Sequence, residues 1–126
     1  MPRKMIFGGY VVLVTLLSVL PSQLFPPSVG TGLPYADKGI HLVLYAVFAV
    51  LLYAVYVERS GGRCLRGGVQ AWIVAASAGY ATAMEFCQLW FCRGSRTFDW
   101  ADAVANLAGA CLGWAMARWV LWRAAR

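Results

Sequence analysis

The chain contains 126 residues, of which 61% are apolar and 13% charged, and its mean hydropathy is +0.64. A soluble domain carries about 25% charged residues, so this chain has too few charges to cover a soluble globule. Its net charge is +6, but the basic residues mostly flank apolar runs, which is typical of a membrane surface. The composition excludes a soluble enzyme, a nucleic-acid-binding module and a disordered tail, and it predicts an integral membrane protein.

Four apolar runs predict the transmembrane segments, at about residues 5–20, 40–57, 69–92 and 100–122. Each approaches the ~20 residues that cross a hydrocarbon core. Because lipid offers no hydrogen-bond partner to the backbone, such spans are expected to be helices. We therefore expect an all-α, polytopic membrane protein whose four helices form a compact bundle, with residues 1–126 in a single domain.

The first apolar run has a second interpretation as a signal peptide, because Arg3 and Lys4 precede it. A signal peptide ends at a small-x-small cleavage site, and no such site occurs near Pro21. The run is also long for the apolar part of a signal peptide. We therefore expect it to be retained as the first transmembrane helix.

The distribution of Lys and Arg over the segments outside the spans predicts the orientation. Eight of these residues lie on the side of the two termini and the second connection: Arg3, Lys4, Arg59, Arg63, Arg66, Arg118, Arg123 and Arg126. Three lie on the other side: Lys38, Arg93 and Arg96. Because cytoplasmic segments carry the excess of positive charge, both termini are expected in the cytoplasm.

With this orientation, the ionisable residues that interrupt the apolar runs, apart from Arg118, fall in one layer near the outer interface. They are Asp37, Lys38, His41, Glu85, Arg96, Asp99 and Asp102, with the amides Gln88 and Asn106 beside them. Glu85 lies ~24 Å along the third helix from its cytoplasmic start, at 1.5 Å per residue. A charge inside a span costs ~2.5–3.5 kcal/mol on insertion scales, so such residues usually face a cavity or a partner.

The spacing of these residues places them on single helix faces. Three sets share a face: Asp37, His41 and Tyr45 on the second helix, Glu85 and Gln88 on the third, and Asp99, Asp102 and Asn106 on the fourth. The last stripe continues as Gly109-x-x-x-Gly113, a spacing that lets another helix approach closely. The polar face of the fourth helix is therefore expected to pack inside the bundle.

A purely structural interpretation remains open for most of these residues. Asp37 and Asp99 have the character of helix N-caps, and Lys38 that of a side chain extending to the interface. Glu85 has a structural alternative as an ion pair with Arg96 or Lys38. Gln88 and Asn106 could instead form hydrogen bonds between helices. The tryptophans could instead mark the membrane interface.

No metal ion or other cofactor is predicted. The four cysteines follow no CxxC pattern, and most lie in or beside apolar runs, where a free cysteine behaves as a small hydrophobe. A zinc site made of His41, Glu85 and Asp102 has suitable ligand types. The chain contains a single histidine, which weighs against that site.

The ordered set of polar residues resembles the VanZ-like family. The pattern runs Asp37-Lys38-x-x-His41-x-x-x-Tyr45, then Glu85-x-x-Gln88, then Arg96-x-x-Asp99-x-x-Asp102-x-x-x-Asn106-x-x-Gly109-x-x-x-Gly113. The resemblance implies a small multi-helix protein of the bacterial cytoplasmic (inner) membrane. It also implies an association with resistance to the lipoglycopeptide teicoplanin, and it brings no defined biochemical activity.

Three functions are compatible with this pattern. The first is a site at the outer interface that binds a lipid-linked or acylated amphiphile, with Lys38 and Arg96 holding an anionic head group and Asp37, Tyr45, Gln88, Asp99, Asp102 and Asn106 lining it. The second is a membrane enzyme, a hydrolase or transferase on a lipid-linked cell-wall precursor, with Glu85 and His41 as acid–base candidates. The third is a small transporter. The bilayer is the expected partner, nucleic acid is not, and a homo-oligomer stays open.

Overall fold

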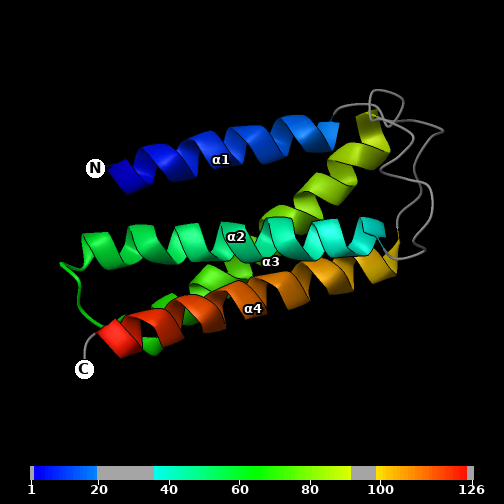
Figure 1. Cartoon of the computed structure of the whole chain (residues 1–126). Helices are drawn as coiled ribbons and strands as arrows, with labels where there is room; N and C mark the ends of the chain where they lie inside the picture. Colours follow the sequence, from blue (N-terminus) through cyan, green and yellow to red (C-terminus); the bar gives the residue numbers. More distant parts are fainter. Residues whose placement is uncertain (1, 20–35, 92–98, 125–126) are drawn as a thin grey trace.

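The structure, a computed structural model, describes residues 2–19, 36–91 and 99–124. These residues form four α-helices, α1 (Pro2–Val19), α2 (Ala36–Arg59), α3 (Gly67–Phe91) and α4 (Trp100–Ala124) (Figure 1). The expected all-α fold is therefore confirmed. The helices α2 and α4 extend beyond the apolar runs at 40–57 and 100–122 because the polar residues at their ends continue the helix outside the predicted spans.

The helix ends carry recognisable capping residues. Pro2 occupies the first position of α1, where its missing N–H and restricted φ are tolerated. After α2, Gly61 and Gly62 adopt positive φ angles of 68° and 79°. The Gly62 N–H donates to the Val57 carbonyl at 2.9 Å and the Gly61 N–H to the Glu58 carbonyl at 3.2 Å, which is a Schellman motif that ends the helix.

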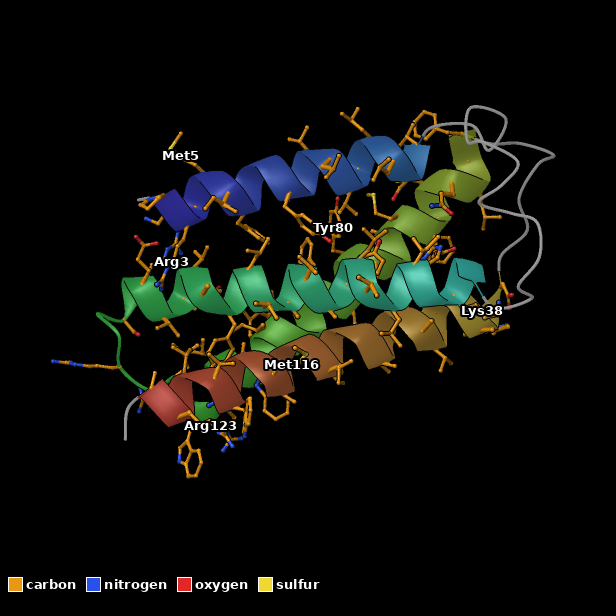
Figure 2. All side chains as sticks on the ribbon, in the orientation of Figure 1. Arg3, Met5, Lys38, Tyr80, Met116 and Arg123 are labelled. Atoms are coloured by element: carbon orange, nitrogen blue, oxygen red, sulfur yellow. The ribbon has the colours of Figure 1, made fainter. Side chains whose placement is uncertain are left out.

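The helices alternate in direction along the bundle. In Figure 1, α1 and α3 run one way while α2 and α4 run the other, so the start of α1 and the end of α4 lie at the same end. Figure 2 shows Arg3 and Arg123 at this end and Lys38 at the opposite end, beside the start of α4. The first and last helices therefore place Arg3 and Arg123 at one end of the bundle, and Lys38 lies at the other (Figure 2).

The helix α1 packs on α2 and α3 through aromatic rings and two polar contacts. The Phe7 ring of α1 meets the Phe48 ring of α2 edge-on, with centroids 5.1 Å apart, and Phe48 in turn stacks on Tyr80 of α3 at 4.8 Å. The Tyr10 hydroxyl donates to the Leu44 carbonyl at 2.7 Å, and the Thr15 and Tyr80 hydroxyls lie 2.6 Å apart. These bonds hold the helices together in lipid, where apolar contact alone gives little preference over lipid tails.

The closest approach in the bundle is between α2 and α4, and it depends on two glycines. A Cβ added at Gly109 would collide with the backbone carbonyl of Leu42, and one added at Gly113 with that of Ala46. Both pairs keep the same offset along the chain, so the two parallel helices hold one register over at least a full turn. Gly109 and Gly113 thus allow backbone-to-backbone packing, the role expected of a small-xxx-small motif.

The outside of the bundle is covered by large apolar side chains. Exposed examples occur on each described helix, among them Leu13 on α1, Val43 on α2, Phe86 on α3 and Met116 on α4. A contiguous apolar surface of this extent is typical of a lipid-facing protein. The structure is that of a membrane protein.

Within the described residues, α1, α2 and α4 are long and apolar enough to cross a membrane. The helix α3 is as long as α4 but does not meet this measure. Its average hydropathy is lowered by Gln70, Glu85 and Gln88, all of which are buried inside the bundle. Because hydropathy averages over every face of a helix, it underestimates the apolar character of the face that α3 turns outward.

We expect Gly109→Ala and Gly113→Ala to destabilise the protein by about 1–3 kcal/mol each, the usual cost of overpacking. Either methyl group would push α4 away from the α2 backbone. Thermal unfolding of the purified protein in detergent measures the effect. Gly79→Ala on α3 is the matched control, because a Cβ at Gly79 meets nothing within 4 Å. Equal unfolding temperatures for Gly113→Ala and Gly79→Ala would contradict the proposed packing role.

Candidate functional site

A cluster of six polar side chains lies between α2, α3 and α4, at the end of the bundle where α2 and α4 begin. We call it the polar site; its members are Lys38, His41, Glu85, Asp99, Asp102 and Asn106. The register of the Gly109 and Gly113 contacts brings the start of α2 alongside the start of α4. The end of α3 completes the site with Glu85.

The outer part of the polar site is an ion-pair cluster around Lys38. Its ammonium group lies 2.8 Å from Asp99 Oδ2 and 3.1 Å from Asp102 Oδ1. Asp99 also caps α4, since its Oδ1 accepts the Ala101 N–H at 2.8 Å. The hydrogen bond from Lys38, and next the bond from the Ala101 backbone, hold the pKa of Asp99 below its usual range. One lysine thus faces two carboxylates from the neighbouring helix.

The inner part of the polar site is a triangle of His41, Asn106 and Glu85, one residue from each helix. His41 Nδ1 lies 3.1 Å from Asn106 Oδ1 and 3.5 Å from Glu85 Oε1. The Asn106 amide nitrogen donates to the same Glu85 oxygen at 3.5 Å. His41, Glu85 and Asn106 are 8%, 5% and 2% exposed, so this triangle is closed off from the surface.

These contacts define the role of each ring nitrogen of His41. An ionised carboxylate only accepts hydrogen bonds, so Asn106 turns its amide nitrogen to Glu85 and its amide oxygen to His41. His41 Nδ1 therefore carries the proton and donates to Asn106 Oδ1. In the neutral imidazole, Nε2 then holds the lone pair, which is available to a proton or a metal ion.

The three groups with metal-binding atoms lie close to one another. One ligand atom each of His41, Glu85 and Asp102 can be chosen so that all three lie within 4.8 Å of one another. The residues come from α2, α3 and α4, and the sequence places all three in the same polar layer. The ligand types considered from the sequence are therefore brought together by the fold.

The other residues expected at the site fall into two groups. Tyr45 is 3% exposed and packs in an apolar cluster with Val14 and Phe48, one turn further into the bundle than His41. Gln88 is buried on α3 one turn beyond Glu85. The side chain of Asp37 and the whole of Arg96 lie outside the described residues. The expected ion pair between Glu85 and Arg96 therefore lies outside them as well.

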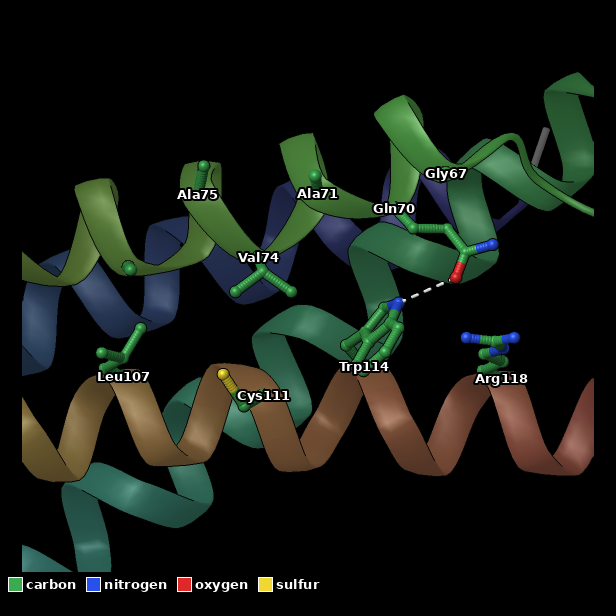
Figure 3. A pocket seen from close by; sticks show the side chains of 10 residues that line it. Gly67, Gln70, Ala71, Val74, Ala75, Leu107, Cys111, Trp114 and Arg118 are labelled. Carbon is green, nitrogen blue, oxygen red and sulfur yellow. Dashed lines mark hydrogen bonds between the residues drawn. The ribbon is translucent and has the colours of Figure 1, made fainter.

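A second polar feature, which the sequence reasoning missed, occupies a groove between α3 and α4 near the opposite end of the bundle (Figure 3). Trp114 Nε1 donates to Gln70 Oε1 at 3.1 Å, and Arg118 lines the groove beside them. The signal was present, since Gln70 and Arg118 both interrupt apolar runs. Trp114 was interpreted only as an interface residue, and its pairing with Gln70 requires the rotation of both helices to be known.

Comparison with known protein families gives the class. The chain is a helical membrane protein with a polar site between three of its helices, and the VanZ/LLP1 family model matches residues 7–122. The chain belongs to the VanZ/LLP1 family. Comparisons with curated proteins and with solved structures give no match.

The lowered pKa of Asp99 predicts how the Lys38 pair responds to pH. A carboxylate whose folded pKa is depressed stabilises the fold fully above its unfolded pKa and loses that contribution as pH falls through the folded value. We therefore expect Asp99→Asn, which keeps the N-cap, to lower the unfolding temperature at neutral pH. The difference from the parent should vanish below the usual carboxyl range.

Unfolding temperatures of both proteins across a pH series measure this effect. Lys38→Gln should lower the unfolding temperature at neutral pH by at least as much, because it removes the common partner of Asp99 and Asp102. A difference between Asp99→Asn and the parent that persists unchanged at acidic pH would show that the Lys38 bond is not its origin.

Proposed function

We propose that this VanZ/LLP1 protein spans the bacterial cytoplasmic membrane four times, with both termini in the cytoplasm. Three helices qualify as spans by length and composition, and α3 joins them because its polar residues are buried and its exposed face carries Trp72, Phe86 and Trp90. The basic residues gather at the end that carries the termini. The polar site then faces the outer interface.

We further propose that the polar site binds an amphiphile from the outer leaflet, either a lipid-linked cell-wall precursor or an acylated glycopeptide. The observation that carries this proposal is a gradient of exposure. The side chains of Asp99, Lys38, Asp102 and Glu85 are 49%, 29%, 13% and 7% exposed. The cluster is therefore accessible at the membrane surface and becomes progressively closed towards Glu85.

The charges of the polar site suit a polar head group. The Lys38 ammonium already contacts two carboxylates, so an anionic head group would exchange with Asp99 or Asp102 for a partner of the same sign. Arg96, just before α4 in the sequence, offers a bidentate donor for phosphate or carboxylate. The lipid-facing surfaces of α2 and α4 on either side would accommodate the acyl chain.

This proposal connects with the resistance that the family resemblance implies. Teicoplanin differs from vancomycin in carrying a fatty acyl chain, and cell-wall precursors are lipid-linked. A site at the depth of the outer interface would meet an acylated molecule and leave a wholly water-soluble one untouched. We therefore propose that the protein contributes to resistance against teicoplanin and not against vancomycin.

The membrane orientation is tested with Cys64, which is exposed between α2 and α3. With the other three cysteines replaced by serine, a membrane-impermeant maleimide should leave Cys64 unlabelled in intact spheroplasts and label it after permeabilisation. A second chain lacking all four cysteines and carrying Ser95→Cys should be labelled in intact spheroplasts. The reverse pattern would place the polar site on the cytoplasmic side and refute the proposal.

The function is tested with Glu85→Gln, which keeps the shape of the side chain and removes its charge. The parent protein should raise the minimum inhibitory concentration of teicoplanin for a sensitive host, with vancomycin unchanged, and Glu85→Gln should abolish the increase. Glu58→Gln is the matched control. It makes the same substitution near the end of α2 that lies away from the polar site. Membrane levels of all three proteins are matched by immunoblot.

Two outcomes would contradict these proposals. Full protection by Glu85→Gln would leave the Glu85 carboxylate with a structural role only. No protection by the parent protein would show that teicoplanin resistance is not a property of this chain.

One contact favours a second candidate, a membrane enzyme acting on a lipid-linked precursor. His41 Nδ1 lies 3.5 Å from Glu85 Oε1, and a histidine held by a carboxylate is a common arrangement for general acid–base catalysis. In that case His41 Nε2 would exchange a proton with the substrate while Glu85 and Asn106 orient the ring. Loss of protection in both Glu85→Gln and His41→Gln, with ligand binding retained, would favour the enzyme.

A further inference from the structure

Where its inner and outer parts meet, the polar site combines an imidazole with two carboxylates. His41, Glu85 and Asp102 each provide a ligand atom, and these atoms lie within 4.8 Å of one another. Each residue is supplied by a different helix, and Glu85 and His41 are buried. Nearby carboxylates repel one another unless positive charge compensates them. Lys38 compensates Asp102 from one side at 3.1 Å, and a cation between His41, Glu85 and Asp102 would compensate both carboxylates.

We propose that His41, Glu85 and Asp102 bind one divalent first-row transition-metal ion, with Zn²⁺ preferred over Mn²⁺ and Mg²⁺. One nitrogen and two oxygen ligands suit Zn²⁺, whereas Mg²⁺ favours oxygen ligands in octahedral geometry. Three protein ligands leave one tetrahedral position open, as in catalytic rather than structural zinc sites. The single histidine, which weighed against zinc in the sequence, is sufficient once two carboxylates stand beside it.

The geometry is close to what coordination requires. Zn–N and Zn–O bonds measure about 2.0–2.2 Å, so two ligands of one tetrahedral ion lie about 3.4 Å apart. The ligand atoms of His41, Glu85 and Asp102 lie within 4.8 Å of one another, so a pair at that separation must close by about 1.4 Å, which side-chain rotation of both residues can supply. The helix backbones need not move, and their register is already held by Gly109 and Gly113.

Asn106 supports the proposed ligand His41 from behind. Metal-binding histidines almost always donate their other ring N–H to an oxygen acceptor, which sets the ring orientation. Here His41 Nδ1 lies 3.1 Å from Asn106 Oδ1; in the proposed site Nδ1 keeps this bond and Nε2 binds the ion. Asn106 in turn donates to Glu85 at 3.5 Å and thereby orients a second ligand.

The charges of the polar site balance when the ion is bound. A divalent cation compensates Glu85 and Asp102, while Lys38 keeps its shorter contact with Asp99 at 2.8 Å. Lys38 also contacts Asp102 at 3.1 Å, so it competes with the ion for that carboxylate. Removing the lysine charge should therefore tighten metal binding, an effect opposite in sign to removal of a ligand.

The metal proposal stands apart from the proposed function. Binding of the ion depends on three side chains and not on the identity of any amphiphile. A negative metal titration would therefore refute only the metal site, and a negative susceptibility assay would refute only the proposed function. A bound ion would hold an anionic oxygen of a head group, or a water molecule, at its open position.

The test is a Zn²⁺ titration of the purified full chain in detergent, against a chromophoric chelator of known affinity. All four cysteines are replaced by serine and the affinity tag contains no histidine, which removes the main adventitious ligands. We expect one Zn²⁺ per chain. His41→Gln, Glu85→Gln and Asp102→Asn should each weaken binding by more than about tenfold. Loss of a residue that only supports a metal ligand already costs about tenfold or more, and these three are the proposed ligands.

Two matched variants separate specific binding from general charge effects. Glu58→Gln makes the same change as Glu85→Gln far from the site and should bind Zn²⁺ as the parent does. Lys38→Gln should bind Zn²⁺ more tightly than the parent. A stoichiometry well below one ion per chain, or equal weakening by Glu58→Gln and Glu85→Gln, would overturn the proposal.

Two further readouts guard against variants that merely fold poorly. Saturating Zn²⁺ should raise the unfolding temperature of the parent, because a ligand that binds only the folded state stabilises it, and should leave that of Glu85→Gln unchanged. Bound Co²⁺ should give visible absorption bands. These bands should disappear when Zn²⁺ replaces Co²⁺ and should persist in excess Mg²⁺. An equal thermal shift in both proteins would mean that the ion binds elsewhere, which also refutes the site.

Discussion

The close approach of α2 and α4 is the constraint on which the polar site depends. Gly109 and Gly113 bring the α4 backbone against the carbonyls of Leu42 and Ala46. Because the two helices run parallel, this single register also aligns their first turns, where Lys38 meets Asp99 and Asp102. A larger residue at either glycine would separate the helices. The contacts of about 3 Å that Lys38 makes with Asp99 and Asp102 would then be lost.

The polar site tolerates burial because each charged group contacts another polar group. A lone ionised carboxylate in an apolar medium is costly, and the cost falls when a partner and hydrogen bonds compensate it. Here Lys38 serves two carboxylates, and Asn106 links His41 to Glu85. Such networks rarely add net stability over an apolar core. Removal of one partner, in contrast, leaves a buried charge uncompensated and is strongly destabilising.

The sequence predicts the helices and the location of the polar layer, and it predicts the partners of its members less well. Apolar runs and the spacing of Gly109 and Gly113 depend only on helix periodicity, which a single segment displays. The pairing of Lys38 depends on how far α2 is displaced along α4 and how each is rotated. The sequence suggests Lys38 as an ion-pair partner of Glu85, whereas in the structure its ammonium group contacts Asp99 and Asp102. For the same reason hydropathy undervalues α3, whose Gln70, Glu85 and Gln88 are buried.

The packing of the helices gives α1 a different role from α2, α3 and α4. Among the described residues, those of the polar site come from α2, α3 and α4, whereas α1 contacts α2 and α3 through Tyr10, Thr15 and an aromatic cluster. Its contacts reach the α2 carbonyl of Leu44, one turn from His41. The helix α1 therefore holds α2 from the side opposite to α4. It stabilises the register from outside the site, and substitutions on its packing face should alter stability before they alter the chemistry of the polar site.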